Sequence, residues 1–473
     1  MHVQYQTRAE ARRQLGPWRR RPPTTVLKFV GSLVFALLVA LVPEHAGMGA
    51  AAREAFFILL FGVGLWVTEA IPAYATALLL IALEIALLGR PGGSFAEGAK
   101  DWEMFVRPFG SPVIWLFFGG FVLAKGASRT GIDRRMASAL LGRFGRRPTS
   151  ALLILMGVTF VFSMFISNTA ATAAMIAVIA PLLATMKEGD PFSKAFLLGV
   201  PFAANLGGMG TVIGSPPNAI ASGALATTQP IGFAEWMTLG LPPALVLVAV
   251  VFIYLRLRYR PTTPALDLAA LDDRPSADDV SRGWQRPLVV VVFLATVVLW
   301  MTGPLHGMPT TVVSFLPIVA FTVFGVLRSA EIRELPWEVL LLLAGGLSLG
   351  LAVTKTGLAD WLVEQLPIES LGPLAVALIL AYLTCVLSNF MSNTAAANIL
   401  VPIALSLAGG SPDLVVPIAL AASAAMALPV STPPNAIAFA TGKIRTADFV
   451  VGGVILGVLG PGLVTLWTWL VMR

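Results

Sequence analysis

The feature that most limits the fold of this chain is a succession of apolar stretches, many about as long as a bilayer is thick. A bilayer core of roughly 30 Å takes about 20 helical residues, and backbone groups in lipid must bond internally, so each stretch predicts a helix. Two stretches, 149–185 and 373–408, are interrupted at the midpoint by the triplet Ser-Asn-Thr, and we interpret them as re-entrant helical hairpins. About eleven full crossings are predicted near 26–43, 54–72, 73–90, 112–127, 194–225, 239–257, 287–303, 310–327, 336–354, 414–441 and 448–471. The predicted fold class is therefore an all-α polytopic membrane protein.

The composition excludes several classes of function. With 57% hydrophobic and 12% charged residues, an ordinary soluble protein is excluded. The 32 Lys and Arg residues exceed the 25 Asp and Glu residues, but they form short clusters between apolar runs, which indicates topology control and no nucleic-acid partner. One cysteine, Cys385, excludes a disulfide scaffold, and three histidines near segment ends make histidine-rich metal chemistry improbable.

The distribution of positive charge predicts the orientation in the membrane. With a basic cytosolic N-terminus over residues 1–25, cytosolic segments collect 26 of the 32 Lys and Arg residues, and six lie outside. No small-residue cleavage site follows the first apolar run, so that run is interpreted as a retained helix. The polar segment 259–286 is rich in Pro and Asp and is expected to be a cytosolic linker between two halves.

The two halves repeat the same motifs in the same order. A Gly-rich helix, a Ser-Asn-Thr triplet and a Pro-Pro-Asn break occur in each, for example FISNTAATAAM from Phe165 and FMSNTAAANIL from Phe390. Five crossings, an odd number, separate the triplets, so the repeats are predicted to be inverted, as in many secondary transporters. The expected regions are scaffold helices at 26–111 and 287–335, a first repeat at 112–258 and a second repeat at 336–473.

Each triplet is expected to begin a helix inside the membrane. Ser, Asn and Thr are preferred N-cap residues, and the Ala-rich runs that follow them are good helix formers. A helix N-terminus carries unpaired N–H groups and a partial positive charge, so it is suited to bind an anion without Lys or Arg. Simple capping explains a lone triplet equally well, but two copies inside long apolar stretches favour a functional site.

The Pro-Pro-Asn breaks provide the complementary group, backbone oxygen. Proline removes amide donors and clashes with the preceding turn, so the helices that precede the breaks are predicted to end near Gly214 and Ser431. New half-helices are expected to begin at Asn218 and Asn435. Carbonyl groups freed before each break are possible ligands for a hard cation such as Na⁺.

A rough energy comparison explains why a cation is expected. Two helix N-termini stabilise an anion by up to about 4 kcal/mol together, whereas each charge at the bilayer centre costs about 2.5 to 3.5 kcal/mol. A dicarboxylate carries two such charges. Since neither hairpin core contains Lys or Arg, mobile cations are the natural neutralising partners.

The motifs closely resemble the divalent anion/sodium symporter family, which carries dicarboxylates, citrate or sulfate. The resemblance rests on the paired SNT triplets, the SPPNAI and STPPNAI breaks and the segment WVTEAIPAYATALL, and it spans about Phe56 to Leu470. It implies a homodimer in the bacterial inner membrane. A scaffold domain would form the dimer contacts, while a transport domain holding both hairpins moves like an elevator.

The resemblance also implies the residues of the site. One sodium site would use Ser163, Ser167, Asn168 and Gly214, and the other would use Ser388, Met391, Asn393 and Ser431. The anion would lie between the two tips, Ser167, Asn168, Thr169 and Ser392, Asn393, Thr394, bordered by Ser215, Pro216, Thr432 and Pro433. The first break has Ser215 where the second has Thr432, which leaves the anion preference open.

These observations predict sodium-coupled symport of a C4-dicarboxylate such as succinate, and no enzyme activity. An intramembrane hydrolase is disfavoured because no histidine lies at membrane depth beside a nucleophile, and a channel because inverted discontinuous repeats suit alternating access. A sodium-independent exchanger remains the main alternative, with citrate or sulfate as alternative substrates. Glu84 can in principle carry a proton, but it lies in the expected scaffold.

Overall fold

The structure is a computed structural model that describes residues 23–41, 45–187, 189–226, 228–268, 283–365, 371–407 and 411–473. These residues form helices joined by turns and loops, with no strand in the described ranges. Most of the predicted basic N-terminus, residues 1–22, and the middle of the predicted linker, residues 269–282, lie outside the described residues.

The chain begins with helices that pack antiparallel to one another, as short turns between long apolar helices require. They are α2 (Pro23–Leu41), α3 (Ala50–Thr68) and α4 (Ala73–Leu83), and α4 continues into a π-helical turn, η2 (Glu84–Gly89). Glu69 ends α3 in the left-handed conformation, with φ of 49°. After a loop, α5 (Glu103–Val106) and the 3₁₀ turn η3 (Arg107–Gly110) lead into α6 (Pro112–Thr130).

The first repeat then folds back on itself at the triplet. Helix α7 (Ile132–Phe144) is followed by the hairpin α8 (Pro148–Ser163) and α9 (Asn168–Thr185). The broken helix comprises α10 (Phe192–Gly207), two 3₁₀ turns η4 (Gly208–Gly210) and η5 (Val212–Gly214), and the half-helix α11 (Pro216–Leu225). Helix α12 (Phe233–Arg258) completes the repeat.

The second repeat has the same order of elements after a pair of intervening helices. The pair is α13 (Gln285–Met301) and α15 (Thr310–Val323), with the short helices α14 (Gly303–His306) and α16 (Ser329–Arg333) beside them. There follow α17 (Trp337–Lys355), α18 (Leu358–Glu364), the hairpin α19 (Pro373–Ser388) and α20 (Asn393–Leu407), the broken helix α21 (Pro412–Ala422) and α22 (Pro433–Phe439), and α23 (Thr446–Val471).

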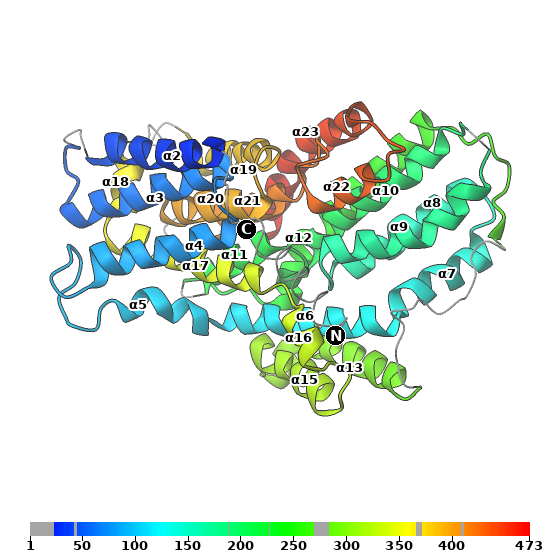
Figure 1. Cartoon of the computed structure of the whole chain (residues 1–473), viewed down its shortest axis with the longest axis horizontal. Helices are drawn as coiled ribbons and strands as arrows, with labels where there is room; N and C mark the ends of the chain where they lie inside the picture. The colour runs from blue at the N-terminus through cyan, green and yellow to red at the C-terminus, as the bar shows by residue number, and fades with distance from the viewer. Residues whose placement is uncertain are drawn as a thin grey trace, which may run out of the picture.

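The contacts between helices follow the sequence repeat. The hairpin α8–α9 packs on α10 and the hairpin α19–α20 packs on α21, while α12 and α23 pack on these broken helices in turn. Figure 1 shows α8 and α9 toward one end of the molecule and α19 and α20 toward the other. The two hairpins therefore lie in different parts of the molecule.

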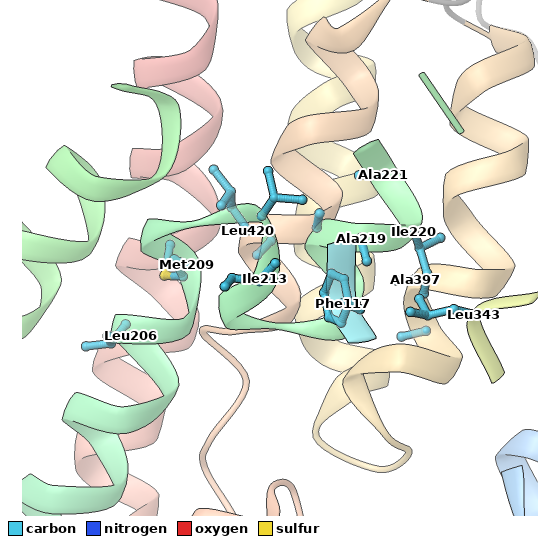
Figure 2. Close-up of a cluster of buried hydrophobic side chains, with 14 of the residues drawn as sticks. Phe117, Leu206, Met209, Ile213, Ala219, Ile220, Ala221, Leu343, Ala397 and Leu420 are labelled. Atoms are coloured by element: carbon cyan, nitrogen blue, oxygen red, sulfur yellow. The ribbon is translucent and has the colours of Figure 1, made fainter. Parts of the chain in front are cut away.

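The first break is fixed by a dense apolar core. Figure 2 shows Leu206, Met209 and Ile213 of the break packed with side chains from five other helices: Phe117 of α6, Ala219 to Ala221 of α11, Leu343 of α17, Ala397 of α20 and Leu420 of α21. Helix α12 also approaches closely, since a Cβ on Gly240 would overlap the Met209 carbonyl oxygen. The break is therefore held rigidly at the centre of the protein.

The lengths of the helices refine the predicted crossings. Seven segments are long and apolar enough to cross a membrane alone, and the other apolar helices in the described ranges have 10–17 residues. The predicted crossing at 112–127 belongs to a longer helical segment, Glu103–Thr130. Two amphipathic helices, α7 and α18, were not predicted, because short helices that alternate charged and apolar residues give little signal in a search for membrane spans.

The predicted ends of the broken helices were wrong. Helix α10 ends at Gly207, before the expected Gly214, because Gly207, Gly208 and Gly210 disfavour helix. Helix α21 ends at Ala422, before the expected Ser431, where a further proline, Pro429, excludes a regular turn. The half-helices begin at Pro216 and Pro433, two residues before the predicted Asn218 and Asn435, since proline at the first helical position needs no amide partner.

Candidate functional site

The first hairpin tip gathers three oxygen-bearing groups around the Asn168 side chain. Ser163 Oγ lies 2.7 Å from the Ala204 carbonyl oxygen and 2.6 Å from Asn168 Oδ1. That end of the Asn168 amide also lies 3.2 Å from the carbonyl oxygens of Ala204 and Gly214. The structure thus brings together Ser163, Asn168 and Gly214, three of the four residues expected in the first sodium site.

The orientation of the Asn168 amide decides how the polar groups of this cluster are satisfied. An amide nitrogen at this position would donate hydrogen bonds to the neighbouring oxygens, whereas the amide oxygen there faces only acceptors. With its nitrogen on this side, the Asn168 amide donates to Ser163 Oγ at 2.6 Å and to the carbonyl oxygens of Ala204 and Gly214 at 3.2 Å, so the cluster is satisfied without an ion. No charged ligand is required, and the described residues contain no group of three His, Cys, Asp or Glu side chains suited to a transition metal.

Two glycines allow the broken backbone to close around Asn168. A Cβ on Gly208 would lie 2.8 Å from Asn168 Oδ1 and 3.0 Å from the Gly214 carbonyl oxygen, and a Cβ on Gly214 would lie 2.6 Å from the Gly208 carbonyl oxygen. Larger residues would therefore push the carbonyl groups away from the tip. This close approach explains why glycine occupies positions 208 and 214.

Ser167 has a different role from the one expected. It is the N-cap of α9, and its hydroxyl accepts a hydrogen bond of 3.2 Å from the Ala170 amide. Ser392 is used in the same way at the second tip, where its hydroxyl accepts from the Ala395 amide at 3.1 Å. Both triplets therefore begin a helix as predicted, with the exposed Ser167 and Ser392 side chains turned toward their own helices.

The second tip carries the equivalent pair of side chains, Ser388 and Asn393. Ser388 is fully buried at the end of α19, and neither its hydroxyl nor the Asn393 amide oxygen has a hydrogen-bond partner in the described structure. Met391 is also buried. These two oxygens at the second tip are therefore free to contact a ligand, since buried polar groups are usually hydrogen-bonded.

Asn389 organises the second break, and sequence reasoning missed it. Its amide nitrogen donates to the Cys385 carbonyl at 2.9 Å, while its oxygen accepts from the Ala427 amide at 2.9 Å and the Ser431 hydroxyl at 3.1 Å. Ser431 thus contacts Asn389 through its side chain. The signal was available, since Asn389 is a polar residue next to Ser388 inside an apolar run.

The asparagine of each Pro-Pro-Asn motif ties the break together. Asn218 donates to the carbonyl oxygens of Gly208 and Thr211, both at 2.8 Å, and Asn435 donates to those of Met426 and Leu428, both at 3.0 Å. The two amides thus replace part of the hydrogen bonding that the breaks remove. These residues were predicted as helix starts, and their side-chain role was missed.

The two repeats meet at the breaks. Asn205 of α10 donates a 3.0 Å hydrogen bond to the Thr432 hydroxyl, and both side chains are buried. Helix α9 packs on α22, and α20 packs on α11, so each hairpin contacts the half-helix of the other repeat. Thr432 also caps α22, whereas Ser215 makes no side-chain cap bond at α11.

The remaining predicted residues lie at the starts of helices. Thr169 is exposed and Thr394 is half-buried, each one residue inside its helix. Pro216 and Pro433 are the first residues of α11 and α22. All of the predicted site residues are neutral, so they offer a ligand only backbone groups, side-chain amides and hydroxyls.

Comparison with known proteins gives consistent matches over most of the chain. The sequence model of the citrate transporter family matches residues 63–413. The chain is 34% identical over 416 residues to the sodium-dependent dicarboxylate transporter SdcS of Staphylococcus saprophyticus, covering 80% of this chain and 78% of that protein. It is 31% identical over 451 residues to SdcS of Staphylococcus aureus, with coverage of 86% and 83%. Among solved structures, the YdaH transporter of Alcanivorax borkumensis, described as having an unusual topology, aligns with a TM-score of 0.53, 13% identity and coverage of 95% and 97%.

Proposed function

The chain belongs to the citrate transporter family, and from that premise we propose that it is a sodium-coupled symporter of C4-dicarboxylates such as succinate. It is a multi-pass membrane transporter and not an enzyme. Sodium is the coupling ion and enters with the substrate.

The observation that carries this proposal is the set of acceptors around Asn168. The Ser163 hydroxyl and the carbonyl oxygens of Ala204 and Gly214 converge on the Asn168 amide, with no positive side chain among them, and the amide would turn its oxygen toward a bound cation as a fourth ligand. The unpaired oxygens of Ser388 and Asn393 support a second site at the equivalent place. Neutral oxygen ligands suit Na⁺, which must be released in each cycle.

The anion would lie where the two tips approach the opposite breaks. The N-terminal amides of α9 and α20 provide partial positive charge, and one carboxylate would be held by Asn168 and Thr169 while the other is held by Asn393 and Thr394. Bound sodium ions close to both tips would offset the remaining negative charge. Ser215, Pro216, Thr432 and Pro433 would border the substrate.

Thr432 is suited to contact the substrate directly. Its hydroxyl oxygen accepts from the Asn205 side chain at 3.0 Å and from the backbone N–H of Asn435 at 3.3 Å, so both of its lone pairs are used. The hydroxyl proton is then directed to a further acceptor, which a substrate carboxylate would supply. Ser215 at the other break accepts no such cap bond, which would make the two ends of the site unequal.

The packing of the helices supports the proposed elevator motion. The hairpins and broken helices of both repeats contact one another and are joined by Asn205 and Thr432, as expected of a unit that moves as one body. Helices α6 and α17 contact α11, and α17 also contacts α20, at the boundary of that unit. The family resemblance and the charge distribution support a homodimer in the bacterial inner membrane with a cytosolic N-terminus.

Uptake into proteoliposomes tests this function. Labelled succinate, citrate and sulfate would be offered with an inward sodium gradient and with potassium in its place. The proposal expects sodium-driven accumulation of succinate that is lost in Asn168→Ala and Asn393→Ala while the oligomer stays intact. Rapid counterflow of succinate in sodium-free vesicles would instead indicate an exchanger.

A further inference from the structure

A fully buried carboxyl group lies outside the candidate site, where α4, α5 and α17 meet. Glu84 is the first residue of the π-helical turn η2, and none of its surface is exposed. Its Oε2 contacts Ser348 Oγ of α17, while its Oε1 has no hydrogen-bond partner. Ser348 Oγ also lies 3.0 Å from the Phe105 carbonyl oxygen of α5.

The number of protons available at Ser348 determines the state of Glu84. A serine hydroxyl donates one hydrogen bond, yet Ser348 Oγ contacts two oxygens, the Phe105 carbonyl and Glu84 Oε2. An ionised carboxylate donates none, so one of the two contacts would bring two acceptors together. A protonated Glu84 donates to Ser348, which then donates to Phe105, and both contacts become hydrogen bonds.

No opposite charge in the described structure compensates for an ionised Glu84. The ion pairs among the described residues join other side chains. The described elements packed against this junction carry charged residues that form no ion pair with Glu84: Arg53 and Glu54 on α3, Glu103 on α5, Arg107 on η3, and Glu338 and Lys355 on α17. A buried carboxylate without a partner is strongly disfavoured relative to the neutral acid.

We propose that Glu84 is a proton-binding site, and that its bound proton joins η2, α17 and α5 through the hydrogen bonds from Glu84 to Ser348 and from Ser348 to Phe105. The location favours a structural effect, because the junction is tightly packed. A Cβ on Gly89, at the end of η2, would lie 2.7 Å from the Phe105 ring and 2.8 Å from Trp102 Cα. Helix α17 in turn contacts α11 and α20.

The proton makes the stability of the protein depend on pH in a defined direction. In the unfolded chain a glutamate is ionised at neutral pH, so the folded state holds one more proton at this position. Stability then falls as the pH rises, because the folded state must be kept protonated against a lower proton concentration. This inference does not depend on the transported substrate or on sodium.

The test compares Glu84→Gln with Glu84→Ala and Ser348→Ala in the full-length purified protein. The amide introduced by Glu84→Gln keeps a donor for Ser348 without a titratable proton, so we expect this variant to retain the wild-type melting temperature and to lose the destabilisation that alkaline buffer causes in the wild type. Glu84→Ala and Ser348→Ala should melt at a lower temperature at every pH. Glu54→Gln is the matched control, since Glu54 accepts from Ser94 at an exposed site and its neutralisation should leave the alkaline destabilisation unchanged.

Infrared spectroscopy of the folded wild type gives a second readout. The difference spectrum of wild type minus Glu84→Gln should contain a carbonyl band of a protonated carboxylic acid that shifts in deuterated water. Carboxylate bands in its place, or equal loss of stability in Glu84→Gln and Glu84→Ala, would overturn the proposal. If Glu84→Gln does not fold, the difference is taken against Ser348→Ala, in which the same acid band must be displaced in frequency.

Discussion

The Asn205 side chain donates a 3.0 Å hydrogen bond to the Thr432 hydroxyl, which joins the broken helix of the first repeat to the break of the second. Asn205 has no polar counterpart in the other repeat, where the equivalent residue is Ala422. The other repeat therefore has no matching hydrogen bond at this position. The Asn205–Thr432 bond links the two halves at the level of the candidate site. A substrate that contacts Thr432 would therefore affect both repeats through this hydrogen bond.

The first prediction concerns this bond. Thr432→Ala removes the acceptor of Asn205 and the cap of α22, so we expect the protein to lose about 1 to 3 kcal/mol of stability and its dicarboxylate KM to rise. Thr432→Ser keeps the hydroxyl and should retain both properties. Thermal unfolding in detergent and initial uptake rates measure the two effects. Equal damage from both substitutions would show that the methyl group, and not the hydroxyl, matters.

The second prediction concerns the first cation site. Ser163→Ala removes one oxygen from the cluster around Asn168, so we expect the sodium concentration at half-maximal uptake to rise about tenfold, an effect of about 1.4 kcal/mol. The maximal rate at saturating sodium should change less. Ser411→Ala is a matched control, because that hydroxyl only caps α21. An unchanged sodium dependence in Ser163→Ala would contradict the assignment.

The third prediction concerns Asn398, which is fully buried in α20 with both amide atoms unpaired. Asn398→Ala should stabilise the protein by about 1 to 3 kcal/mol, because it removes unsatisfied polar atoms. Gly346→Ala should destabilise it, since the new Cβ would overlap Asn398 Oδ1. In the Asn398→Ala background, Gly346→Ala should cost less stability than it does in the wild type, because residues in contact couple. A double variant whose change in melting temperature equals the sum of the two single changes would contradict this coupling.

The fourth prediction concerns Asp190, in the loop before α10. Its carboxylate accepts from Phe192 N at 2.9 Å, Thr262 N at 3.1 Å, Thr263 N at 2.8 Å and Thr263 Oγ1 at 2.7 Å. Burial alone would raise the pKa of Asp190, but the hydrogen bonds from Thr263, Phe192 and Thr262 outweigh it and lower the pKa. The stability that Asp190 provides is present above the ordinary aspartate pKa of about 3.9 and is lost as the pH falls through the lower folded value.

Asp190→Asn should therefore lower the melting temperature at neutral pH. It should also make the melting temperature fall less as the pH is lowered into the acid range. It should also speed chymotryptic cleavage after Leu266, a buried residue shortly beyond Thr263, because Asp190 anchors the start of the segment that connects the repeats. Asp413→Asn in the first turn of α21 serves as a comparison outside this anchor. Unchanged cleavage after Leu266 would show that other contacts hold the segment.

The sequence predicted the fold class and the helix starts at the triplets because these depend on local chemistry. Ser167 and Ser392 cap helices as their residue types predict, and Pro216 and Pro433 are the first residues of the half-helices. Ser163 and Asn168, which the family resemblance placed in one site, contact each other at the first tip.

Other features depend on contacts between distant residues and could not be predicted from local patterns. Asn389 reaches the backbone of the second break 38 residues later, and Asn205 reaches Thr432 across 227 residues. The first break is also held by α12, where Trp236 Nε1 donates to the Met209 carbonyl oxygen at 3.2 Å. The Ser167 side chain was expected in the sodium site, whereas in the structure it accepts a hydrogen bond from Ala170 as the N-cap of α9.

The most direct test of the account is the flux of labelled sodium into proteoliposomes with and without external succinate. If the two tips bind sodium together with a dicarboxylate, succinate will stimulate sodium entry, and Asn168→Ala and Asn393→Ala will each abolish the stimulation. Sodium entry that is the same with and without succinate, together with undiminished succinate uptake in sodium-free buffer, would contradict it.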